Sequence, residues 1–321
     1  MIKPAIQHVL STLQSFNFDT LDISDYNRAY IKRLSPNLSY YMDIYTQMIR
    51  MSGQQPQSGL YAVDFGGGHG FLSMLLKACG YNVIYVDINP LSAHTAKVIK
   101  EKTGLGADII LEGSTEDLYK FCEQNNIKPQ IFFAADLIEH VYNLDKFFLR
   151  LKNINPKMEM IFTTASNHLN IYKCHKLHKE QKQDEKDFFM QRKVFIENNF
   201  PKITDAELWA RRTRGMRFDD IRQAAENGIL PSKPKNKYNT CDPKSGNWTE
   251  RILSFGAYRN ITGKNGFNVT FQKGYYNTKR NNILFSFLCK TMNIVIRFSG
   301  SAGYFIAPYI LLRVATLEKN H

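Results

Sequence analysis

The segment from Tyr61 to Asn89, YAVDFGGGHGFLSMLLKACGYNVIYVDIN, constrains the fold of this chain more than any other. An apolar run ends at Asp64, a glycine-rich turn follows, and a helical pattern leads to a second apolar run that ends at Asp87. Glycine has no Cβ, so such a turn lets a ligand approach the backbone closely. An acid at the end of the second strand is placed to bind both hydroxyls of a ribose. The segment therefore predicts a nucleoside-cofactor site.

The glycine spacing separates the classes of nucleoside cofactor. A dinucleotide fingerprint, G-x-G-x-x-G, fails from Gly66, because its third glycine would fall on Phe71. From Gly68 the third glycine would fall on Ser73, which is a weak match. No G-K-[ST] follows, which excludes a P-loop. The pattern that fits is D-x-G-x-G-x-G, formed by Asp64, Gly66, Gly68 and Gly70.

This pattern resembles the first motif of the class I S-adenosylmethionine-dependent methyltransferases. The resemblance implies that the glycine backbone lies beside the amino-acid arm and the adenosine of S-adenosyl-L-methionine, with Asp64 supporting the loop. The alternative is a plain tight turn between strand and helix, which the acids on both sides disfavour. That family often has an acid where Ser114 stands, so this chain departs from it there. The further cofactor contacts that the resemblance implies are Asp87, Ile88, Ser114, Thr115, Glu116, Asp136 and Leu137.

Five more apolar runs predict strands, at 107–111, 130–135, 158–164, 267–272 and 307–315. Their alternation with helical segments predicts a parallel α/β sheet. The resemblance, close over 61–165 and loose over 250–316, implies a Rossmann-like sheet of seven strands. The predicted division of the chain is an N-terminal helical cap (1–58, with a linker at 52–59), a cofactor-binding core (59–165), a helical insertion after the fifth strand that serves as a substrate lid (166–249), and a C-terminal part of the core with a short helical insert (250–321).

The run Asp136-Leu137-Ile138-Glu139-His140-Val141 follows the fourth predicted strand. It resembles the corresponding motif of small-molecule methyltransferases, including O-methyltransferases of quinone and sugar biosynthesis. An oxygen acceptor needs a base, and His140 is a candidate because imidazole titrates near neutrality. Glu139 is predicted to orient the imidazole or the acceptor, or to help hold a divalent ion, as in some quinone O-methyltransferases. The alternative is that both residues cap a helix; His168, after the fifth strand, is a second base candidate.

Composition sets further limits. With 43% hydrophobic residues in 321, the chain has ample material for a core. Its five cysteines form no C-x-x-C pair, so neither a zinc site nor a disulfide framework is predicted, and the N-terminus lacks a secretory pattern. These features predict a reduced, cytoplasmic protein. The net charge of +13 suggests an anionic partner, but the D-L-I-E after the fourth strand and the lack of a basic low-complexity tail argue against nucleic acid.

The insertion holds two candidate substrate-binding groups. Four arginines within seven residues, Arg211, Arg212, Arg214 and Arg217, predict an anionic acceptor, since guanidinium groups bind phosphate or carboxylate in a bidentate manner. The alternative is ion pairing with the nearby acids Glu207, Asp219 and Asp220. Trp248, flanked by polar residues, either stacks on a sugar or other planar ligand or anchors its loop to the core.

The apolar stretch 282–314 is interrupted by Lys290, Arg297, two glycines and Pro308, so it contains no run of the ~20 apolar residues that a spanning helix needs. Ile283 to Phe298 is predicted to be an amphipathic helix, and peripheral contact with a membrane stays open. The overall prediction is a methyltransferase for a small or glycan-precursor acceptor, methylated at oxygen. The alternatives are a nicotinamide-dependent dehydrogenase, which the failed fingerprint disfavours, and a non-catalytic binding subunit with a cofactor fold.

Overall fold

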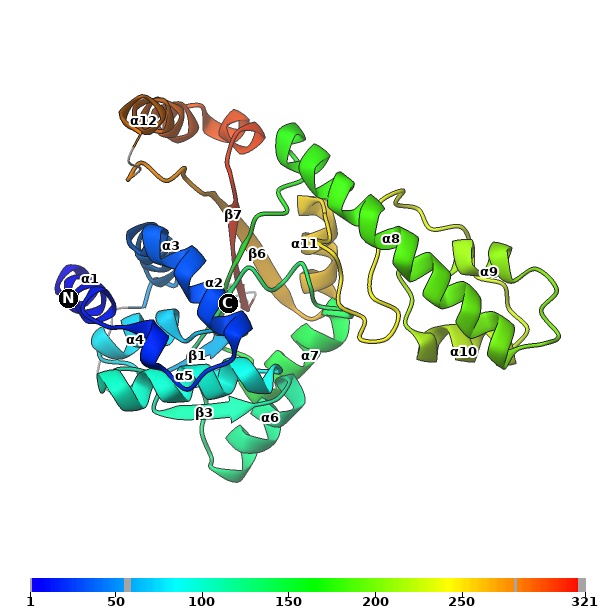
Figure 1. Ribbon diagram of the computed structural model, residues 1–321, viewed down its shortest axis with the longest axis horizontal. Coiled ribbons are helices and arrows are strands. Elements are labelled where there is room, and N and C mark those ends of the chain that lie inside the picture. Colours follow the sequence, from blue (N-terminus) through cyan, green and yellow to red (C-terminus); the bar gives the residue numbers. More distant parts are fainter. Residues whose placement is uncertain (1, 55–58, 280–281, 317–321) are drawn as a thin grey trace, which may run out of the picture.

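The computed structural model describes residues 2–54, 59–279 and 282–316, and the predicted linker at 52–59 lies partly outside them (Figure 1). Within these residues, seven strands form one sheet with the order β3-β2-β1-β4-β5-β7-β6, in which β7 is antiparallel to both neighbours. The strands are β1 (Tyr61–Phe65), β2 (Asn82–Asp87), β3 (Ile109–Glu112), β4 (Ile131–Ala135), β5 (Glu159–Thr164), β6 (Phe267–Lys273) and β7 (Ile310–Thr316). The predicted seven-stranded α/β sheet is confirmed, but the prediction that it is parallel is wrong for β7, which runs antiparallel.

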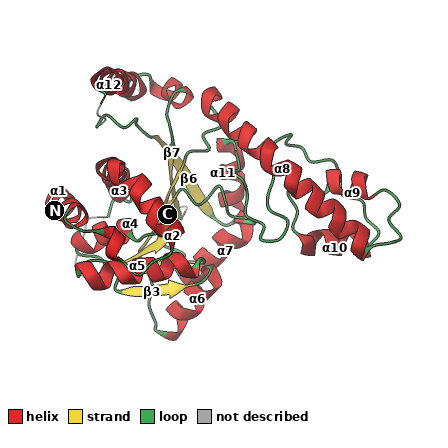
Figure 2. Ribbon diagram, in the orientation of Figure 1, coloured by secondary structure: helices red, strands yellow, loops and turns green. Residues whose placement is uncertain are grey.

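The sheet is buried on both faces, because successive side chains of a strand point to opposite sides. In β1, Ala62 packs into one apolar cluster and Val63 into the other; in β4, Phe133 and Phe132 divide in the same way. The first cluster contains the N-terminal helices together with α4 (Phe71–Ala78) and α5 (Pro90–Thr103). The second contains α6 (Thr115–Gln124), α7 (Leu144–Ile154) and α11 (Phe255–Lys264). Figure 2 shows this arrangement of helices around the strands.

The N-terminal helices are α1 (Ile2–Gln14), α2 (Asp25–Leu34) and α3 (Leu38–Met51), joined by short 3-10 turns at Phe18–Thr20 and Ser35–Asn37. Ser24 caps α2 by accepting a hydrogen bond from the amide of Asn27. The buried Asn27 side chain donates to the backbone oxygen of Leu91 and to the hydroxyl of Thr95, both at 2.8 Å. These bonds attach α2 to α5, so the N-terminal cap is held against the core.

The insertion after β5 forms a helical arm that projects from the sheet (Figure 1). It consists of α8 (Ile171–Asn199), α9 (Ala206–Arg212) and α10 (Phe218–Glu226), with a small apolar cluster of its own around Ile196 and Ile221. Arg192 is fully buried there; it donates to the backbone oxygen of Ala210 and pairs with Glu185. The arm therefore has its own packed interior.

The segment between β6 and β7 contains α12 (Ile283–Phe298), as predicted, and a 3-10 turn, η3 (Gly300–Phe305). The last strand was predicted from residue 307 but begins at Ile310, because Pro308 lacks the N–H that a ladder position requires. The other predicted strands agree within two residues. Among the described residues, no helix is both long and apolar enough to cross a membrane.

Candidate functional site

A cavity of about 200 Å³ lies at the carboxyl ends of β1 and β4, under the N-terminal cap. Its walls come from α2 and α3, from the glycine turn after β1, and from the ends of β4 and β5. None of the lining residues belongs to the arm, so the cap, rather than the predicted lid, covers this cavity. The lining residues are Tyr30, Leu34, Tyr41, Ile44, Tyr45, Asp64, Gly66, Gly67, Gly68, His69, Phe71, Leu72, Ala135, Asp136 and Thr163.

The glycine turn has a backbone that other residues would strain. Gly66 has φ +68°, and a Cβ there would lie 2.1 Å from the Cδ1 atom of Leu137. Gly68 has φ +53° and nothing within 4 Å of its Cβ position, so this side of the turn is open. Its amide donates to Asp87 Oδ2 at 3.0 Å, and the hydroxyl of Tyr85 donates to its carbonyl at 2.6 Å. The predicted motif therefore forms one rigid unit with the end of β2.

The two predicted acids of this unit differ in surroundings. Asp64 is buried and accepts a hydrogen bond of 2.6 Å from the Ser73 hydroxyl. Burial raises the pKa of Asp64 to about 7, the negative charge of Asp87 adds to this, and the Ser73 bonds partly offset it. Asp87 accepts from the amides of Gly68 and Asn89, and burial raises its pKa as well. Ile88, beside it, is 76% exposed and offers an apolar surface next to this carboxylate.

The predicted adenine contacts have structural roles. The hydroxyl of Ser114 accepts from the amide of Glu116 and donates to Asp117, which forms a capping box at the start of α6. The Glu116 side chain pairs with Arg150 at 2.9 Å, and Thr115 is buried. The adenine assignment of 114–116 stays a prediction.

Aromatic residues of the cap complete the cavity, although the sequence prediction named none of them individually as a site residue. The ring of Tyr30 stacks on that of His69, with 4.9 Å between centroids. Burial lowers the pKa of His69 to about 4, so the ring is neutral at pH 7, and its Nε2 atom has no hydrogen-bond partner. Burial also raises the pKa of Tyr45. The only sequence signals were the aromatic helix faces near residues 30 and 41 and the histidine within the glycine run.

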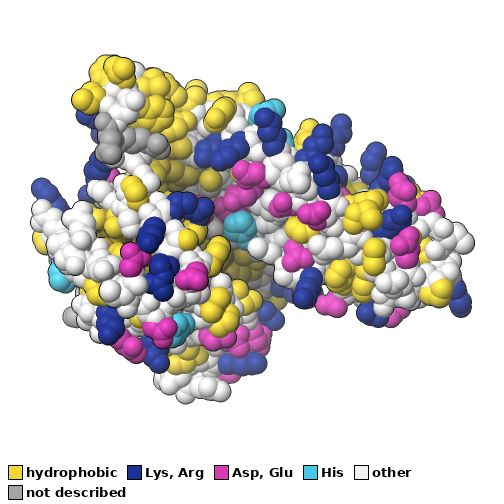
Figure 3. All heavy atoms as spheres, viewed as in Figure 1, with side chains coloured by type: hydrophobic (Ala, Val, Ile, Leu, Met, Phe, Trp, Pro, Cys, Tyr) yellow, Lys and Arg dark blue, Asp and Glu magenta, His cyan; other side chains and the backbone are white. Residues whose placement is uncertain are grey.

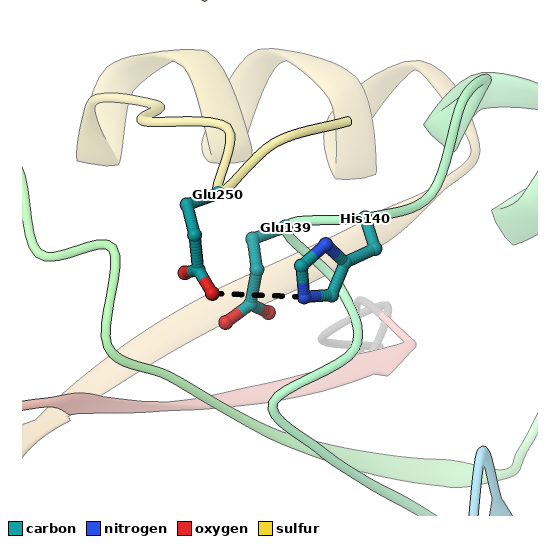
Figure 4. Close-up of side chains that lie close together, drawn as sticks. All are labelled: Glu139, His140 and Glu250. Carbon is teal, nitrogen blue, oxygen red and sulfur yellow. Dashed lines mark ion pairs between the residues drawn. The ribbon is translucent and has the colours of Figure 1, made fainter. Parts of the chain in front are cut away.

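A second group of polar side chains lies outside the lining of the cavity (Figure 4). Glu139 and His140, from the loop after β4, meet Glu250, from the base of the arm, and the candidate ligand atoms of the three lie within 4.8 Å of one another. His140 Nδ1 is 2.8 Å from the backbone oxygen of Trp248, and its Nε2 is 3.8 Å from Glu250 Oε1. A carbonyl only accepts, so Nδ1 carries the proton and Nε2 of the neutral ring has a free lone pair. Glu250 was not predicted.

Burial and repulsion between carboxylates disfavour the ionised forms of Glu139 and Asp136. Glu139 is 1% exposed, and neither of its carboxylate oxygens makes a hydrogen bond of good geometry. The nearby Thr164 hydroxyl lowers the pKa of Glu139, but this effect is smaller than those that raise it. Burial, then the charges of Asp136 and Glu250, raise the pKa of Glu139 well above its usual range. Asp136 reaches the cavity surface, yet the surrounding protein and Glu250 raise its pKa too. Three carboxyl groups together favour a bound cation.

Two of these acids also have strained backbones. Asp136 has φ +48° and Glu250 has φ +46°, in the left-handed region that few residues other than glycine adopt. Such a conformation costs about 1–3 kcal/mol and persists where surrounding contacts impose it. For Glu250 these contacts include Gln181 of α8, which donates to its backbone oxygen at 2.8 Å. Strained acids that face one another are typical of a functional site.

The remaining predicted residues lie elsewhere. The ring of His168 packs edge-on against Phe255, and burial lowers its pKa; it belongs neither to the cavity nor to the acid cluster. In the arm, Arg211 pairs with Glu207, and Arg214 donates to the backbone oxygens of residues 236 and 237. Neither these two nor Arg212 lines the cavity. Their predicted role in binding an anionic acceptor stays a prediction.

Trp248 anchors its loop, the alternative that the sequence left open. Its ring stacks on Tyr142 with 6.2 Å between centroids, and its Nε1 donates to the Tyr142 backbone oxygen at 3.1 Å. The guanidinium of Arg251 lies 4.3 Å from the ring centroid. These contacts position the carbonyl that fixes His140, and the predicted stacking of Trp248 on a ligand stays a prediction.

Comparisons with known proteins agree with this architecture. The chain is 28% identical over 116 residues to the ubiquinone biosynthesis O-methyltransferase of Rickettsia akari (strain Hartford), a match that covers 36% of this chain and 44% of that protein. The match to the same-named protein of Rickettsia canadensis (strain McKiel) is also 28% over 116 residues and covers 36% and 47%. The chain thus spans less than half the length of these curated relatives. No protein-family model matches the chain.

Two solved structures that resemble this chain have lower sequence identity to it than the Rickettsia proteins do. A SAM-dependent methyltransferase from Archaeoglobus fulgidus has a TM-score of 0.43 at 12% identity, over 85% of this chain and 93% of that one. Magnesium protoporphyrin IX methyltransferase from Synechocystis, with bound SAH, has a TM-score of 0.40 at 13% identity, over 86% and 80%. These scores are too low to carry an argument. The chain thus resembles the class I S-adenosylmethionine-dependent methyltransferases in its D-x-G-x-G-x-G motif, in its sequence similarity to the Rickettsia proteins and in its seven-stranded sheet.

Proposed function

We propose that this protein transfers the methyl group of S-adenosylmethionine to an oxygen atom of a small acceptor. The observation that carries the proposal is the position of His140, whose Nε2 atom lies near Glu139 and Glu250, four residues after the cavity-lining Asp136 in the chain. The name of the Rickettsia relatives, O-methyltransferases of ubiquinone biosynthesis, supports oxygen as the methylated atom.

The residues of the cavity fit this cofactor. An ammonium group beside Asp64 would favour the ionised carboxylate, whose pKa of about 7 reflects burial without a cationic partner. Asp87 stands at the end of β2, where a carboxylate binds ribose hydroxyls, and the exposed Ile88 next to it suits a flat apolar base. The open side of Gly68 admits the ligand, and the unpartnered Nε2 of His69 offers it a hydrogen bond. When bound, the cofactor supplies a methyl group already activated on a sulfonium.

The chain's own residues would position the acceptor and remove its proton. The hydrogen bond to Trp248 fixes the ring of His140, so Nε2 is available as the base. The cap supplies an aromatic wall, in which Tyr30, Tyr41 and Tyr45 suit a planar or carbohydrate-like acceptor. The arginines of the arm have no part in this proposal, since they do not line the cavity.

Glu139, His140 and Glu250 also match the donor set of a divalent cation, which would occupy Nε2 of His140 and so take the place of its role as the base. The fit rests on the buried Glu139, whose two oxygens lack good partners, and on the fixed ring of His140, which resembles a ligand oriented by an outer hydrogen bond. A cation there would lower the pKa of an acceptor hydroxyl. This goes beyond the sequence prediction, in which no metal centre was assigned and Glu139 was only one candidate contact.

The proposal is tested by binding and turnover. S-adenosylhomocysteine should raise the melting temperature of the purified protein and NAD should not; at 100 times Kd the stabilisation is about 2.7 kcal/mol. Asp87→Asn should remove most of this effect, while the exposed Asp25→Asn should keep it. Transfer of a labelled methyl group to catechol-like or sugar acceptors then identifies the acceptor class. Stabilisation by NAD would refute the proposal, and tight cofactor binding without transfer to any acceptor would favour a binding subunit.

A further inference from the structure

Helix α12 presents a wide apolar face to solvent. Leu284, Phe287 and Phe298 are 82%, 70% and 76% exposed, which is unusual for large apolar side chains. Seven exposed residues make up what we call the α12 face: Ile283, Leu284, Phe287, Leu288, Ile294, Val295 and Phe298. Apolar patches of this extent mark interaction sites rather than ordinary surface.

The geometry of the helix shows that this face is continuous. Cys289 and Ile296, seven residues apart, are buried against the body of the protein. The exposed residues recur at intervals of three and four on the opposite side, so they form one stripe along the helix. By the same spacing, Lys290 and Arg297 lie along one margin of the stripe.

The charge of the surrounding segment is of one sign. From residue 251 to residue 316 the sequence contains nine Lys and Arg and no Asp or Glu. At the end of α12, the ammonium group of Lys273 donates to the backbone oxygens of Ile296 and Gly300, at 2.6 and 2.8 Å. This contact places a further positive charge where the carbonyl groups of a helix end would otherwise be negative. The apolar face thus has a basic border.

Neighbouring elements extend the apolar surface. Phe305 of η3, and Ile171 and Tyr172 at the start of α8, are all more than half exposed. Asn170, just before α8, donates to the backbone oxygen of Ala307, so these residues lie close together in the fold. Figure 3 shows apolar side chains gathered over α12 and along the adjacent edge of the molecule.

The α12 face is also linked to the cover of the cavity. The loop between β6 and α12 is bound to the start of α3 through three contacts: Tyr40 to Tyr275, Asn277 to Asn37, and Lys279 to Asp43. The same helix carries Tyr41 and Tyr45, which line the cavity. A surface that receives α12 would therefore lie next to the helices that cover the proposed active site.

We propose that the α12 face binds the surface of an anionic lipid bilayer, with the helix lying parallel to the membrane. At about 1.5 Å per residue, α12 is some 24 Å long, too short to cross a hydrocarbon core of about 30 Å, and the cations on its margin suit headgroup phosphates. A bilayer accepts apolar side chains and a basic border at the same time. A second copy of the chain would instead bring two acid-free basic segments together.

The test is co-sedimentation of the full chain with vesicles of phosphatidylglycerol and phosphatidylcholine in equal amounts, compared with vesicles of phosphatidylcholine alone. We expect at least tenfold stronger binding to the anionic vesicles, weakened in 1 M NaCl because salt screens the charges. Leu284→Glu/Phe287→Glu should abolish binding. The matched control Leu149→Glu/Ile229→Glu changes exposed apolar residues on other elements and should leave it unchanged.

The basic border is tested separately. Lys290→Gln/Arg297→Gln should weaken binding to anionic vesicles about tenfold or more, while Lys182→Gln/Lys186→Gln in the arm should not. All variants should keep the parental melting temperature and response to S-adenosylhomocysteine, since none of these residues lines the cavity. Equal binding to both vesicle types, or none to either, would overturn the proposal. A dimer in light scattering that Leu284→Glu/Phe287→Glu converts to monomers, without vesicle binding, would assign the face to a second copy.

Discussion

The Nδ1 atom of His140 lies 2.8 Å from the backbone oxygen of Trp248, at the base of the arm. The bond sets both the tautomer and the direction of the imidazole, because only a protonated Nδ1 can donate to a carbonyl. In turn, the amide of Trp248 lies 3.3 Å from the His140 backbone oxygen, so the two segments are bound to each other. The base of the arm is thus part of the proposed catalytic site.

Replacing His140 tests its role as the base. His140→Ala should lower kcat by about 10²–10⁴-fold, the usual contribution of general acid–base catalysis. Cofactor affinity should change little, since the glycine turn follows β1 and Asp87 ends β2, both remote in sequence from His140. His168→Ala is the matched control and should keep parental turnover. Steady-state kinetics and thermal shift with S-adenosylhomocysteine measure the two effects, and parental turnover of His140→Ala would remove it from the mechanism.

A divalent cation should stabilise the protein through the acid cluster. Mg²⁺ or Mn²⁺ should raise the melting temperature of the parent, because the cation neutralises carboxylates that lie close together. Glu139→Gln and Glu250→Gln should each remove most of this rise. Glu226→Gln, on an exposed part of α10, should preserve it. If EDTA and the cations leave parental stability and turnover unchanged, the cluster orients the acceptor without a metal.

Cofactor affinity should depend on the ionisation of Asp64. Its pKa is raised to about 7, so below that pH the protonated carboxyl cannot pair with a ligand ammonium group. Affinity should therefore rise by up to about tenfold per pH unit towards pH 7 and level off above it. Asp64→Asn should flatten the profile. Calorimetry in buffers of different ionisation enthalpy should show proton release on binding near pH 6.5; a flat parental profile would contradict this assignment.

The same shift has a consequence for the free protein. The raised pKa means that the folded state holds the proton of Asp64 more tightly than the unfolded chain does. The contribution of Asp64 to the free energy of unfolding is complete below its pKa in the unfolded chain, near 4, and is lost as the pH rises through its folded pKa of about 7. Without ligand, Asp64→Asn should thus lose less stability than the parent between pH 5 and 8. Thermal melts over this range provide the measurement.

The glycine turn should tolerate no side chain at its first position. Gly66→Ala combines a positive φ with a clash against Leu137, so it should cost about 1–3 kcal/mol of stability and most of the cofactor affinity. Gly263→Ala, in α11, meets nothing within 4 Å and should instead stabilise by about 0.5–1 kcal/mol. Denaturant titration compares the two. A neutral Gly66→Ala would show that the turn rearranges freely.

The sheet and the cofactor motif were predictable because their signals are local. Apolar runs predict the strands, and the residues from Asp64 to Gly70 contain the whole turn in one short stretch. Glu250 had no such signal: it reaches Glu139 from more than a hundred residues away, on a loop whose polar composition indicates only turns. Tyr45 was missed for a similar reason, because an aromatic residue on a helix face is usually part of a core. Pairing across loops depends on tertiary packing, which periodicity does not encode.

The arm is attached to the acid cluster in the first half of α8, so the far end of the helix can move further than the attached part. Gln181 donates to the backbone oxygens of Thr249 and Glu250, which fixes the helix at that point next to the acid cluster. The helix continues for 18 residues to Asn199, or about 27 Å at 1.5 Å per residue. A tilt that moves the far tip by several ångströms therefore moves Glu250 by a small fraction of that distance. A displacement of the distal helices therefore reaches the site with a reduced amplitude, and the geometry around His140 changes less than the position of the tip of the arm.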